Sequence, residues 1–207
     1  MQTAILNNQQ FKMSNWSGGT TTELFIFPHD ASYQKRNFIF RLSTAKVEIE
    51  KSEFTSLPGV TRKIVILDGE IRINHHNHYA KTLSKFDVDS FKGDWKTTSV
   101  GTCTDFNLMT TLKTRTELAA VVIEENQLLD YPVEPGWDWL IIYLYSGHIN
   151  MHLDNDFFDL GPGNLLVISN VTSSALHIKG VKKANWFFQK SNDKAKHLVT
   201  NRCVSEQ

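Results

Sequence analysis

The feature that most constrains this chain is a series of short apolar runs, each too short for a helix and each followed by turn-forming residues. The runs are rich in Ile, Val, Phe and Thr and are separated by Gly, Asn, Asp and Pro, which is the pattern of many short strands joined by turns. No helical period extends over three turns outside the tail that follows Ser191. We therefore predict an all-β fold, with helix confined to short connections. The strands are expected at Thr21–Phe27, Phe38–Ile49, Lys63–Leu67, Glu70–Asn74, Phe106–Leu112, Leu118–Glu124, Leu140–Tyr145, His148–Leu153, Asn164–Ile168, Ala175–Lys179 and Asn185–Gln189.

An internal repeat suggests that one β unit occurs twice in the chain. The segment IVILDGEIRI at residues 64–73 is echoed by IYLYSGHINM at residues 142–151. Each copy has an apolar strand, a turn that closes on glycine (Gly69 or Gly147) and an alternating strand, which we interpret as a hairpin. Together with the strand pattern, the repeat favours two stacked jelly-roll barrels.

The two barrels are expected to divide the chain near its middle. We predict an N-terminal barrel over residues 1–113, which carries the pocket described below, a C-terminal barrel over residues 114–190 and a tail over residues 191–207. The connection between the barrels is expected within residues 113–130. A chain of 207 residues is long enough for two β units to share a core without disulfides.

Charge and composition exclude several classes of partner. Because 22 Lys and Arg residues balance 22 Asp and Glu residues, the chain has no broad basic face for nucleic acid. The first residues lack the pattern of a signal peptide, and the longest apolar run, Trp139–Tyr145, is too short to cross a bilayer. The sequence does not decide whether Cys103 and Cys203 form a disulfide, although reduced thiols fit a chain of this size better. We expect a cytoplasmic protein that binds neither nucleic acid nor membrane.

The first candidate for chemistry is an arginine in an otherwise apolar strand. Strand alternation puts Arg41 and Ser43 on the same face as Ile39, Ala45 and Val47. A buried guanidinium costs several kcal/mol unless an anion or a set of hydrogen bonds compensates it. Arg41 therefore either pairs with a structural carboxylate or binds an anionic ligand.

A second cation and a polar strand add to this candidate site. Arg62 follows the turn at residues 57–60, and Asp105 and Asn107 share one face of another strand. If these side chains point inwards, they line one polar pocket in an apolar barrel. In the alternative, Asp105 only neutralises one of the two arginines, and the other arginine still needs a partner.

Metal and nucleophile chemistry find less support. His75, His76 and His78 lie close together and raise the question of a divalent metal site. Residues 105–109, where a further histidine ligand would be needed, contain none. We expect the three histidines at the exposed tip of a hairpin and predict no metal. The sequence also lacks a nucleophile elbow and a phosphate-binding loop, so no catalytic residue is predicted.

Five motifs in the first half of the chain resemble the HutD/Ves family. Between Trp16 and Thr111 they are, in order, NWSGGTTTE at 15–23, FRLSxAxV at 40–47, FTxLPGVxR at 54–62, FKGD at 91–94 and DFNLM at 105–109. The usual opening of the family, Trp-Lys/Arg-Asn-Gly-x-Gly, is shorter here and lacks its basic residue. Past Leu118 the resemblance is mostly architectural.

The resemblance implies a bicupin that lacks metal-binding histidines and needs no cofactor. Members of the family are linked to histidine utilisation, where a regulatory role through binding of a pathway metabolite has been proposed. No enzymatic activity is established for the family, so the resemblance implies a binding protein more than an enzyme. Carried over residue by residue, it places in the pocket Trp16, Thr20, Glu23, Arg41, Ser43, Phe54, Arg62, Asp105 and Asn107.

Three functional hypotheses follow. The first is a regulatory protein that binds a small anionic metabolite, such as a carboxylate from histidine breakdown, through the two arginines. The second is a metal-independent enzyme, an isomerase or hydrolase, with Glu23 or Asp105 as general base. The third is a protein-interaction module, which would have a plugged barrel with no room for a ligand. A homodimer is compatible with all three.

Overall fold

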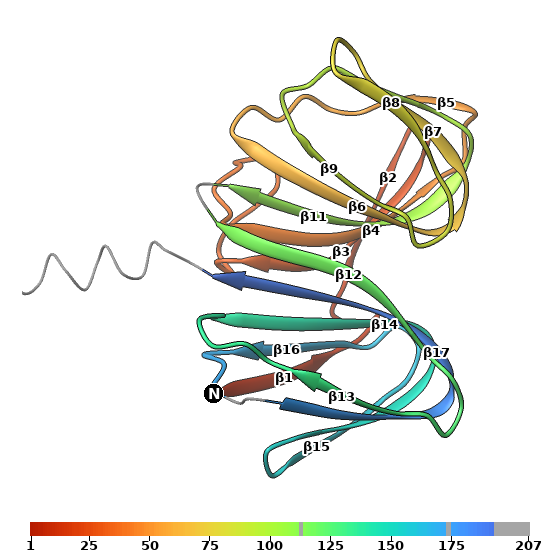
Figure 1. Cartoon of the computed structure of the whole chain (residues 1–207). Helices are drawn as coiled ribbons and strands as arrows, with labels where there is room; N and C mark the ends of the chain where they lie inside the picture. The colour runs from red at the N-terminus through yellow and green to blue at the C-terminus, as the bar shows by residue number, and fades with distance from the viewer. Residues whose placement is uncertain (112–113, 173–174, 193–207) are drawn as a thin grey trace, which may run out of the picture. The chain divides into compact units, whose positions relative to one another are not determined.

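Every regular element that the structure describes is a β-strand (Figure 1). The computed structural model describes residues 1–111, 114–172 and 175–192. Their strands form three antiparallel sheets within two compact units: unit 1, residues 1–9 and 113–207, and unit 2, residues 10–112. The all-β prediction is confirmed. Among the described residues, no helix has the length and apolar character needed to cross a bilayer.

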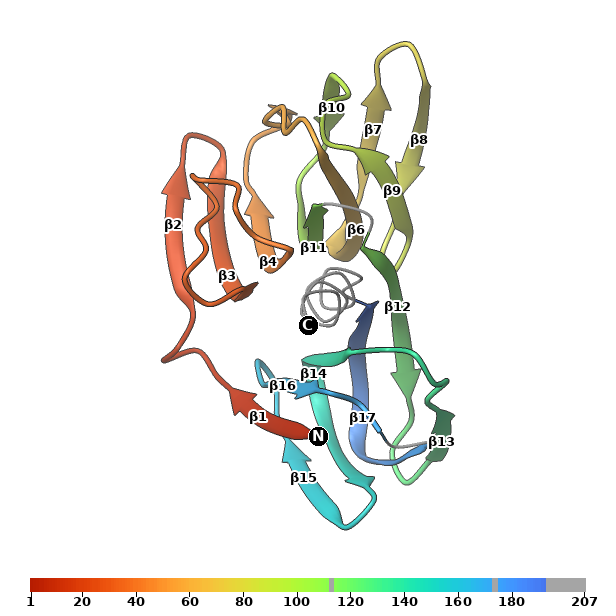
Figure 2. The same cartoon turned by 90° about the vertical axis from the view of Figure 1, so that its left-hand side faces the viewer.

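The larger sheet of unit 2 has six strands in the order β2-β3-β4-β11-β6-β9, and Figure 2 shows β2, β3 and β4 side by side. In its centre, side chains alternate between an apolar face, with Leu42 and Leu108 fully buried, and a face that carries Arg41 and Asn107. The strands are β2 (Lys12–Trp16), β3 (Gly19–Phe27), β4 (Phe40–Val47), β6 (Val60–Gly69), β9 (Val88–Lys92) and β11 (Cys103–Thr111).

The smaller sheet of unit 2 closes an apolar core against the larger one. Its order is β5-β10-β7-β8. Ile71 and Ile73 of this sheet belong to the same buried cluster as Ile64 and Ile66 of β6. Since Arg62 lies on the same face of β6 as these isoleucines, the apolar core gives way to polar side chains at one end of that strand. The strands are β5 (Lys51–Glu53), β7 (Ile71–His75), β8 (Tyr79–Leu83) and β10 (Thr97–Val100).

Unit 1 is built on one seven-stranded sheet around a second apolar core. The main order is β1-β16-β14-β17-β12, with β13 paired to β17 and β15 paired to β14. Leu140, Ile142 and Trp186 of this core are completely buried. The strands are β1 (Gln2–Leu6), β12 (Arg115–Ile123), β13 (Leu128–Pro132), β14 (Trp139–Leu153), β15 (Asp156–Leu160), β16 (Leu165–Ser169) and β17 (Ala175–Asn192).

The internal repeat is a bent strand rather than the predicted hairpin. Gly69 (φ 82°) and Gly147 (φ 87°) adopt the same left-handed conformation in the two copies. At Gly69 the chain passes from β6 in the larger sheet to β7 in the smaller sheet, and these two strands belong to different sheets. In the second copy β14 continues through Gly147, with irregular pairing between Leu144 and Ile149. A glycine turn can redirect a chain between sheets as well as reverse it, so the hairpin interpretation is wrong.

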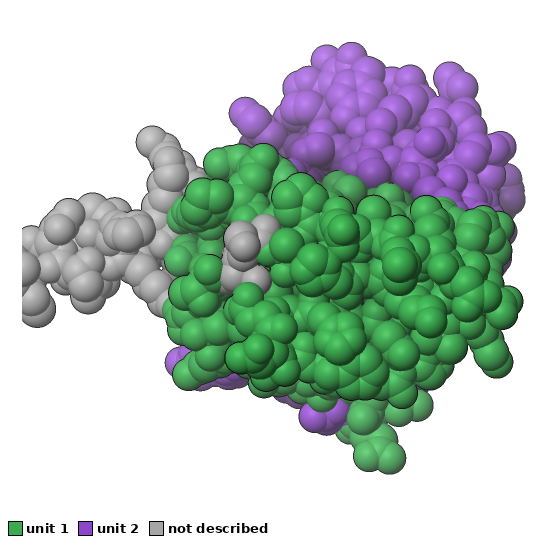
Figure 3. Space-filling model, turned by 60° about the horizontal axis from the view of Figure 1, so that its bottom comes forward, with its two compact units in different colours: residues 1–9, 113–207 green, residues 10–112 purple. Residues whose placement is uncertain are grey.

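The start of the chain joins the unit formed by its second half (Figure 3). Strand β1 pairs with β16, with Gln2 opposite Ser169 and Leu6 opposite Leu165. The first barrel therefore consists of residues 10–112, whereas the prediction gave it residues 1–113.

The predicted connection and tail also differ from the structure. Within residues 113–130, β12 pairs with β17 from Arg115 to Ile123, so most of this segment is a strand of unit 1. The predicted tail at 191–207 begins with the last two residues of β17, and residues 193–207 lie outside the described part of the chain.

Candidate functional site

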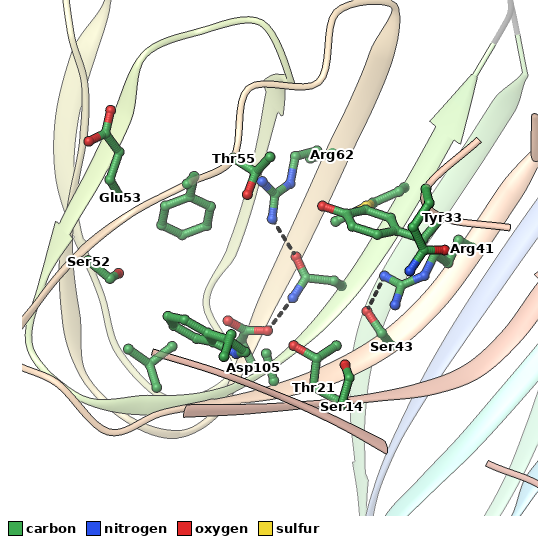
Figure 4. A pocket seen from close by; sticks show the side chains of 17 residues that line it. Ser14, Thr21, Tyr33, Arg41, Ser43, Ser52, Glu53, Thr55, Arg62 and Asp105 are labelled. Carbon is green, nitrogen blue, oxygen red and sulfur yellow. Dashed lines mark hydrogen bonds between the residues drawn. The ribbon is translucent and has the colours of Figure 1, made fainter. Parts of the chain in front are cut away.

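Unit 2 contains a cavity of about 310 Å³ beside the polar face of its larger sheet (Figure 4). Strands β2, β3, β4, β6 and β11 contribute side chains, as do β5 with the loop after it and the loop between β3 and β4. The lining residues are Ser14, Trp16, Thr21, Tyr33, Gln34, Arg41, Ser43, Ala45, Val47, Ser52, Glu53, Phe54, Thr55, Arg62, Asp105, Asn107 and Met109.

The structure brings most of the sequence-predicted site residues to this cavity. Thr20 is not among the lining residues, and its neighbour Thr21 is. The reason is strand alternation: Thr21 pairs with Ala45 on the cavity face, whereas Thr20 pairs with Lys46. Glu23 does not line the cavity but binds a residue that does. The predicted residues in the lining are Trp16, Arg41, Ser43, Phe54, Arg62, Asp105 and Asn107.

The two arginines lie in one row across the sheet. On the central strand β11, Met109 is opposite Arg41 of β4 on one side and Arg62 of β6 on the other. Two strand spacings therefore separate the arginine backbones, which is about 10 Å. Both side chains are buried, with 6% of each residue exposed. Two cations thus face one small cavity, and each needs compensation.

Arg41 is compensated within the protein. Its Nε lies 2.7 Å from Oε2 of Glu23, and its Nη1 donates to Oγ of Ser43 at 3.0 Å. The guanidinium carbon also lies 4.7 Å from the centre of the Tyr33 ring, a favourable cation–π distance. Of the two alternatives for Arg41, a structural carboxylate or an anionic ligand, the structure therefore supports the first, with Glu23 as the partner.

Arg62 has much weaker compensation. Its Nη2 donates to Oδ1 of Asn107 at 3.3 Å, and its guanidinium carbon lies 4.9 Å from the Phe54 ring and 5.3 Å from the Phe91 ring. Within the described part of the chain, the buried Nε of Arg62 has no hydrogen-bond partner. Burial lowers the pKa of Arg62 from 12.5 to about 10, against the opposing attraction of Asp105. The guanidinium is therefore a buried cation whose hydrogen-bonding capacity is only partly used.

Asp105 is the acidic group that the same hydrogen-bond network links to Arg62. Its Oδ1 accepts a hydrogen bond from Nδ2 of Asn107, so the Asn107 amide bridges Asp105 and Arg62. In Figure 4 these two hydrogen bonds are the dashed lines that end at the labelled Arg62 and Asp105. Only 3% of Asp105 is exposed. Burial raises the pKa of Asp105 from 3.8 to about 7, although Arg62 and the backbone of Ala45 oppose the increase. At neutral pH this carboxyl therefore exchanges readily between its neutral and ionised forms.

The sequence did not identify seven of the lining residues with polar or aromatic groups. They are Ser14, Thr21, Tyr33, Gln34, Ser52, Glu53 and Thr55. Tyr33 lies in the loop between β3 and β4, where no periodic pattern assigns a direction to a side chain. Ser14 lies on the exposed strand β2, directly opposite Thr21. The pairing of Ser14 with Thr21 follows from the turn at Ser17-Gly18, a signal that could have placed both hydroxyls on the cavity face.

The predicted hairpin-tip histidines divide into two kinds. His78 is exposed as expected, but His75 is 1% exposed and lies at the end of β7. Its Nε2 is 2.8 Å from Oδ2 of Asp89, and its Nδ1 is 2.8 Å from Oγ1 of Thr97. Side-chain alternation on β7 directs His75 to the core. The polar residues that surround it in the sequence gave no sign of this burial.

The residues present do not fit the metal site that some cupin folds carry. The cavity lining includes no histidine, and its carboxylates, Glu53 and Asp105, come from different strands. Among the described residues, no group of three His, Cys, Asp or Glu side chains is arranged to hold a metal ion. Divalent transition metals prefer imidazole-rich sets, whereas this cavity offers guanidinium, amide and hydroxyl groups.

A protein-family comparison and a structural comparison agree on the architecture. A family model described as HutD matches residues 8–186. A conserved protein of unknown function from Pseudomonas aeruginosa PAO1 has a TM-score of 0.82 at 20% identity, over 93% of this chain and 100% of that chain. HutD from Pseudomonas fluorescens SBW25, solved in a formate condition, has a TM-score of 0.69 at 17% identity, over 93% and 100%.

Oxalate decarboxylases are also similar in structure. The enzyme from Lactobacillus farciminis, solved as a formate complex, has a TM-score of 0.68 at 10% identity, over 98% of this chain and 92% of that chain. At such low identity the likeness shows the fold alone, and it confirms the predicted cupin architecture. No curated protein sequence matches the chain significantly.

Proposed function

The chain belongs to the HutD family, and we propose that it binds a small carboxylate in the cavity of unit 2, without a metal ion, as a regulatory protein of histidine utilisation. The proposal joins the family's link to that pathway with the chemistry of the cavity. Such a role belongs in the cytoplasm, where histidine breakdown supplies small carboxylates. A homodimer is compatible with the proposal, which requires no partner other than the ligand.

The observation that carries the proposal is the unpaired part of Arg62. Its Nε is buried without a partner among the described residues, and its one hydrogen bond goes to the neutral oxygen of Asn107. A carboxylate can accept two parallel hydrogen bonds from a guanidinium. Such a ligand would satisfy the Nε and supply the missing charge, and both effects are strong because the group is shielded from water.

The remaining groups suit the second end of a small metabolite. The cavity volume of about 310 Å³ is near the lower end of the range for small-molecule sites. Hydroxyls of Ser14 and Thr21 can bond a formyl, amide or ring nitrogen, while Trp16 and Phe54 form aromatic walls.

Calorimetric titration tests this function. Formate, urocanate, N-formylglutamate and glutamate are titrated into the purified protein and into Arg62→Gln. We expect at least one of these carboxylates to bind, with at least a tenfold loss of affinity in the variant because a charge-assisted pair is worth about 1.5–3 kcal/mol. Arg72→Gln is the matched control, since Arg72 is exposed on β7 of the same unit. Binding that is equal in all three proteins would refute the proposal.

A second function is favoured by one observation, the raised pKa of Asp105. A carboxyl with a pKa of about 7 is suited to proton transfer at neutral pH, so Asp105 could serve as general base in a metal-independent isomerase or hydrolase. If the protein converts one of the four carboxylates and Asp105→Asn loses this activity, the enzyme hypothesis is supported. If a carboxylate binds and none of the four is converted, the regulatory protein is supported.

The interaction-module hypothesis fits the structure less well. It requires a plugged barrel, whereas unit 2 has a cavity lined by charged and polar groups. Binding of a partner protein with equal affinity in the wild type and in Arg62→Gln, without any carboxylate binding, would restore it.

A further inference from the structure

We infer that the cavity takes up its carboxylate together with one proton, and that Asp105 holds this proton. The inference rests on the proposed function and adds a regulatory property to the same site. It makes occupancy depend on pH in the neutral range, and it assigns to Asp105 a positioning role rather than direct contact with the ligand.

The geometry links the two groups through a single amide. Asn107 donates from Nδ2 to Asp105 and accepts at Oδ1 from Arg62, so its two ends are committed to opposite partners. Asp105 and Asn107 occupy alternate positions on the cavity face of β11. In the free protein, the ionised form of Asp105 is therefore the counter-charge of Arg62, acting through the bridge instead of by direct contact.

A bound carboxylate takes over this counter-charge. When its oxygens contact the free side of the Arg62 guanidinium, two carboxyl groups share one cation in a site shielded from water. Two carboxylates that share a site cannot both ionise readily, so one of them binds a proton. Asp105 is the one that does so, because it reaches Arg62 only through the amide and only 3% of it is exposed. Its pKa of about 7 in the free protein means that this proton is available near neutral pH.

The other ionisable groups around Asp105 do not take this role. On β4 and β3, Arg41 and Glu23 form a direct pair at 2.7 Å. On β11 itself, burial and Asp105 raise the pKa of Cys103 to about 12, so its thiol stays neutral. The remaining lining groups are Tyr33, whose ring stacks on Arg41, and Glu53 of β5, which is exposed to solvent. Histidine is absent from the lining.

The inference predicts how affinity changes with pH. Below the pKa of Asp105 in the free protein the group is already protonated, and affinity is at its maximum. Above it, binding must first add a proton, so affinity falls by up to about tenfold per pH unit until the pH exceeds the pKa in the complex. Affinity falls as the pH rises because the ionised form of Asp105 competes with the ligand for Arg62 in the folded protein.

The test uses N-formylglutamate and formate, which do not titrate between about pH 6 and pH 8.5. Calorimetry at about pH 7.5 in two buffers with different heats of protonation gives the number of protons taken up with each probe. We expect uptake of up to about one proton and a matching fall in affinity towards pH 8.5. In Asp105→Asn, which is permanently neutral, we expect no proton uptake and strong binding that persists at high pH.

The matched control is Asp68→Asn, the same exchange at an exposed position of the neighbouring strand β6, which should keep the wild-type pH dependence. Carboxyl NMR titration of Asp105 with and without formate is a second measurement that needs no variant, and its pKa should rise on binding. If a probe binds without proton uptake and the NMR titration is unchanged, the inference is wrong while the proposed function stands. If no carboxylate binds at any pH, both fall.

Discussion

Replacing Asp105 by asparagine should change how the stability of the protein depends on pH. The pKa of Asp105 is about 7 in the folded state and 3.8 for the unperturbed group. Below about pH 4 the carboxyl is protonated in both states. Between about pH 4 and pH 7 it ionises only in the unfolded chain, which lowers the free energy of the unfolded state and destabilises the fold. Above about pH 7 the loss is complete.

The size of this effect follows from the difference of about 3 pH units. At 1.36 kcal/mol per unit, an ionised Asp105 costs the folded state about 4 kcal/mol. The side chain introduced by Asp105→Asn carries no charge and escapes this cost. It has one carbonyl oxygen for two donors, the Asn107 amide and the Ala45 backbone, so the variant loses about 1 kcal/mol at every pH. The pH-dependent part of the difference in unfolding free energy therefore reports the perturbed pKa of Asp105, whereas the constant loss of about 1 kcal/mol does not.

Urea denaturation at half-unit steps from about pH 4.5 to pH 8.5 measures the quantity directly. The stability of Asp105→Asn relative to the wild type should rise by about 3 kcal/mol between pH 4.5 and pH 8, because part of the effect lies below pH 4.5. Asp68→Asn, at an exposed position of β6, should show a flat difference. A flat difference for Asp105→Asn as well would show that burial does not perturb this carboxyl and would remove the basis of the proton-uptake inference.

Three further outcomes are expected. Asp89→Asn should lower the free energy of unfolding by about 3 kcal/mol in denaturant titrations, because it breaks a buried pair. Asp159→Asn, in an exposed pair, should lower it by less than about 1 kcal/mol. Equal losses in the two variants would show that burial does not strengthen the first pair. Gly69→Ala should lower the melting temperature more than Gly59→Ala, since both have positive φ but only the first places its Cβ 2.5 Å from a carbonyl oxygen. Cys103 should resist alkylation at about pH 8 until the protein is unfolded, because its pKa is about 12; peptide mapping that finds it modified in the folded protein would be inconsistent with this environment.

Strand alternation predicted the parts of the site that lie on regular strands. It placed Arg41 and Ser43 on one face and Asp105 and Asn107 on another, and the structure joins these faces around one cavity. The family resemblance placed Thr20 in the pocket and was wrong by one position, because three consecutive threonines give no sign of which one points inwards. The pairing of β3 with β4 decides the matter, and that pairing includes an irregularity after Glu23.

Two parts of the fold were not predicted from the sequence, the bend at Gly69 and strand β1, and both depend on contacts between residues far apart in the chain. The sequence around Gly69 fits a reversal and a bend equally well, and the choice depends on which strands β6 and β7 find as partners, namely β11 and β10. Strand β1 was not predicted because it is short and largely exposed, and its partner β16 lies near the other end of the chain. A local pattern does not encode such a pairing.

The pairing of β1 with β16 also sets the order in which this protein can assemble. The segment Gln2–Leu6 is synthesised before unit 2, whereas its partner Leu165–Ser169 is synthesised only after all of unit 2. Residues 10–112 can complete their own sheets in the meantime, since every strand pairing of unit 2 lies within that range. Strand β1 therefore precedes unit 2 in synthesis but can dock only after it, and until it docks, β16 presents an open edge to other chains.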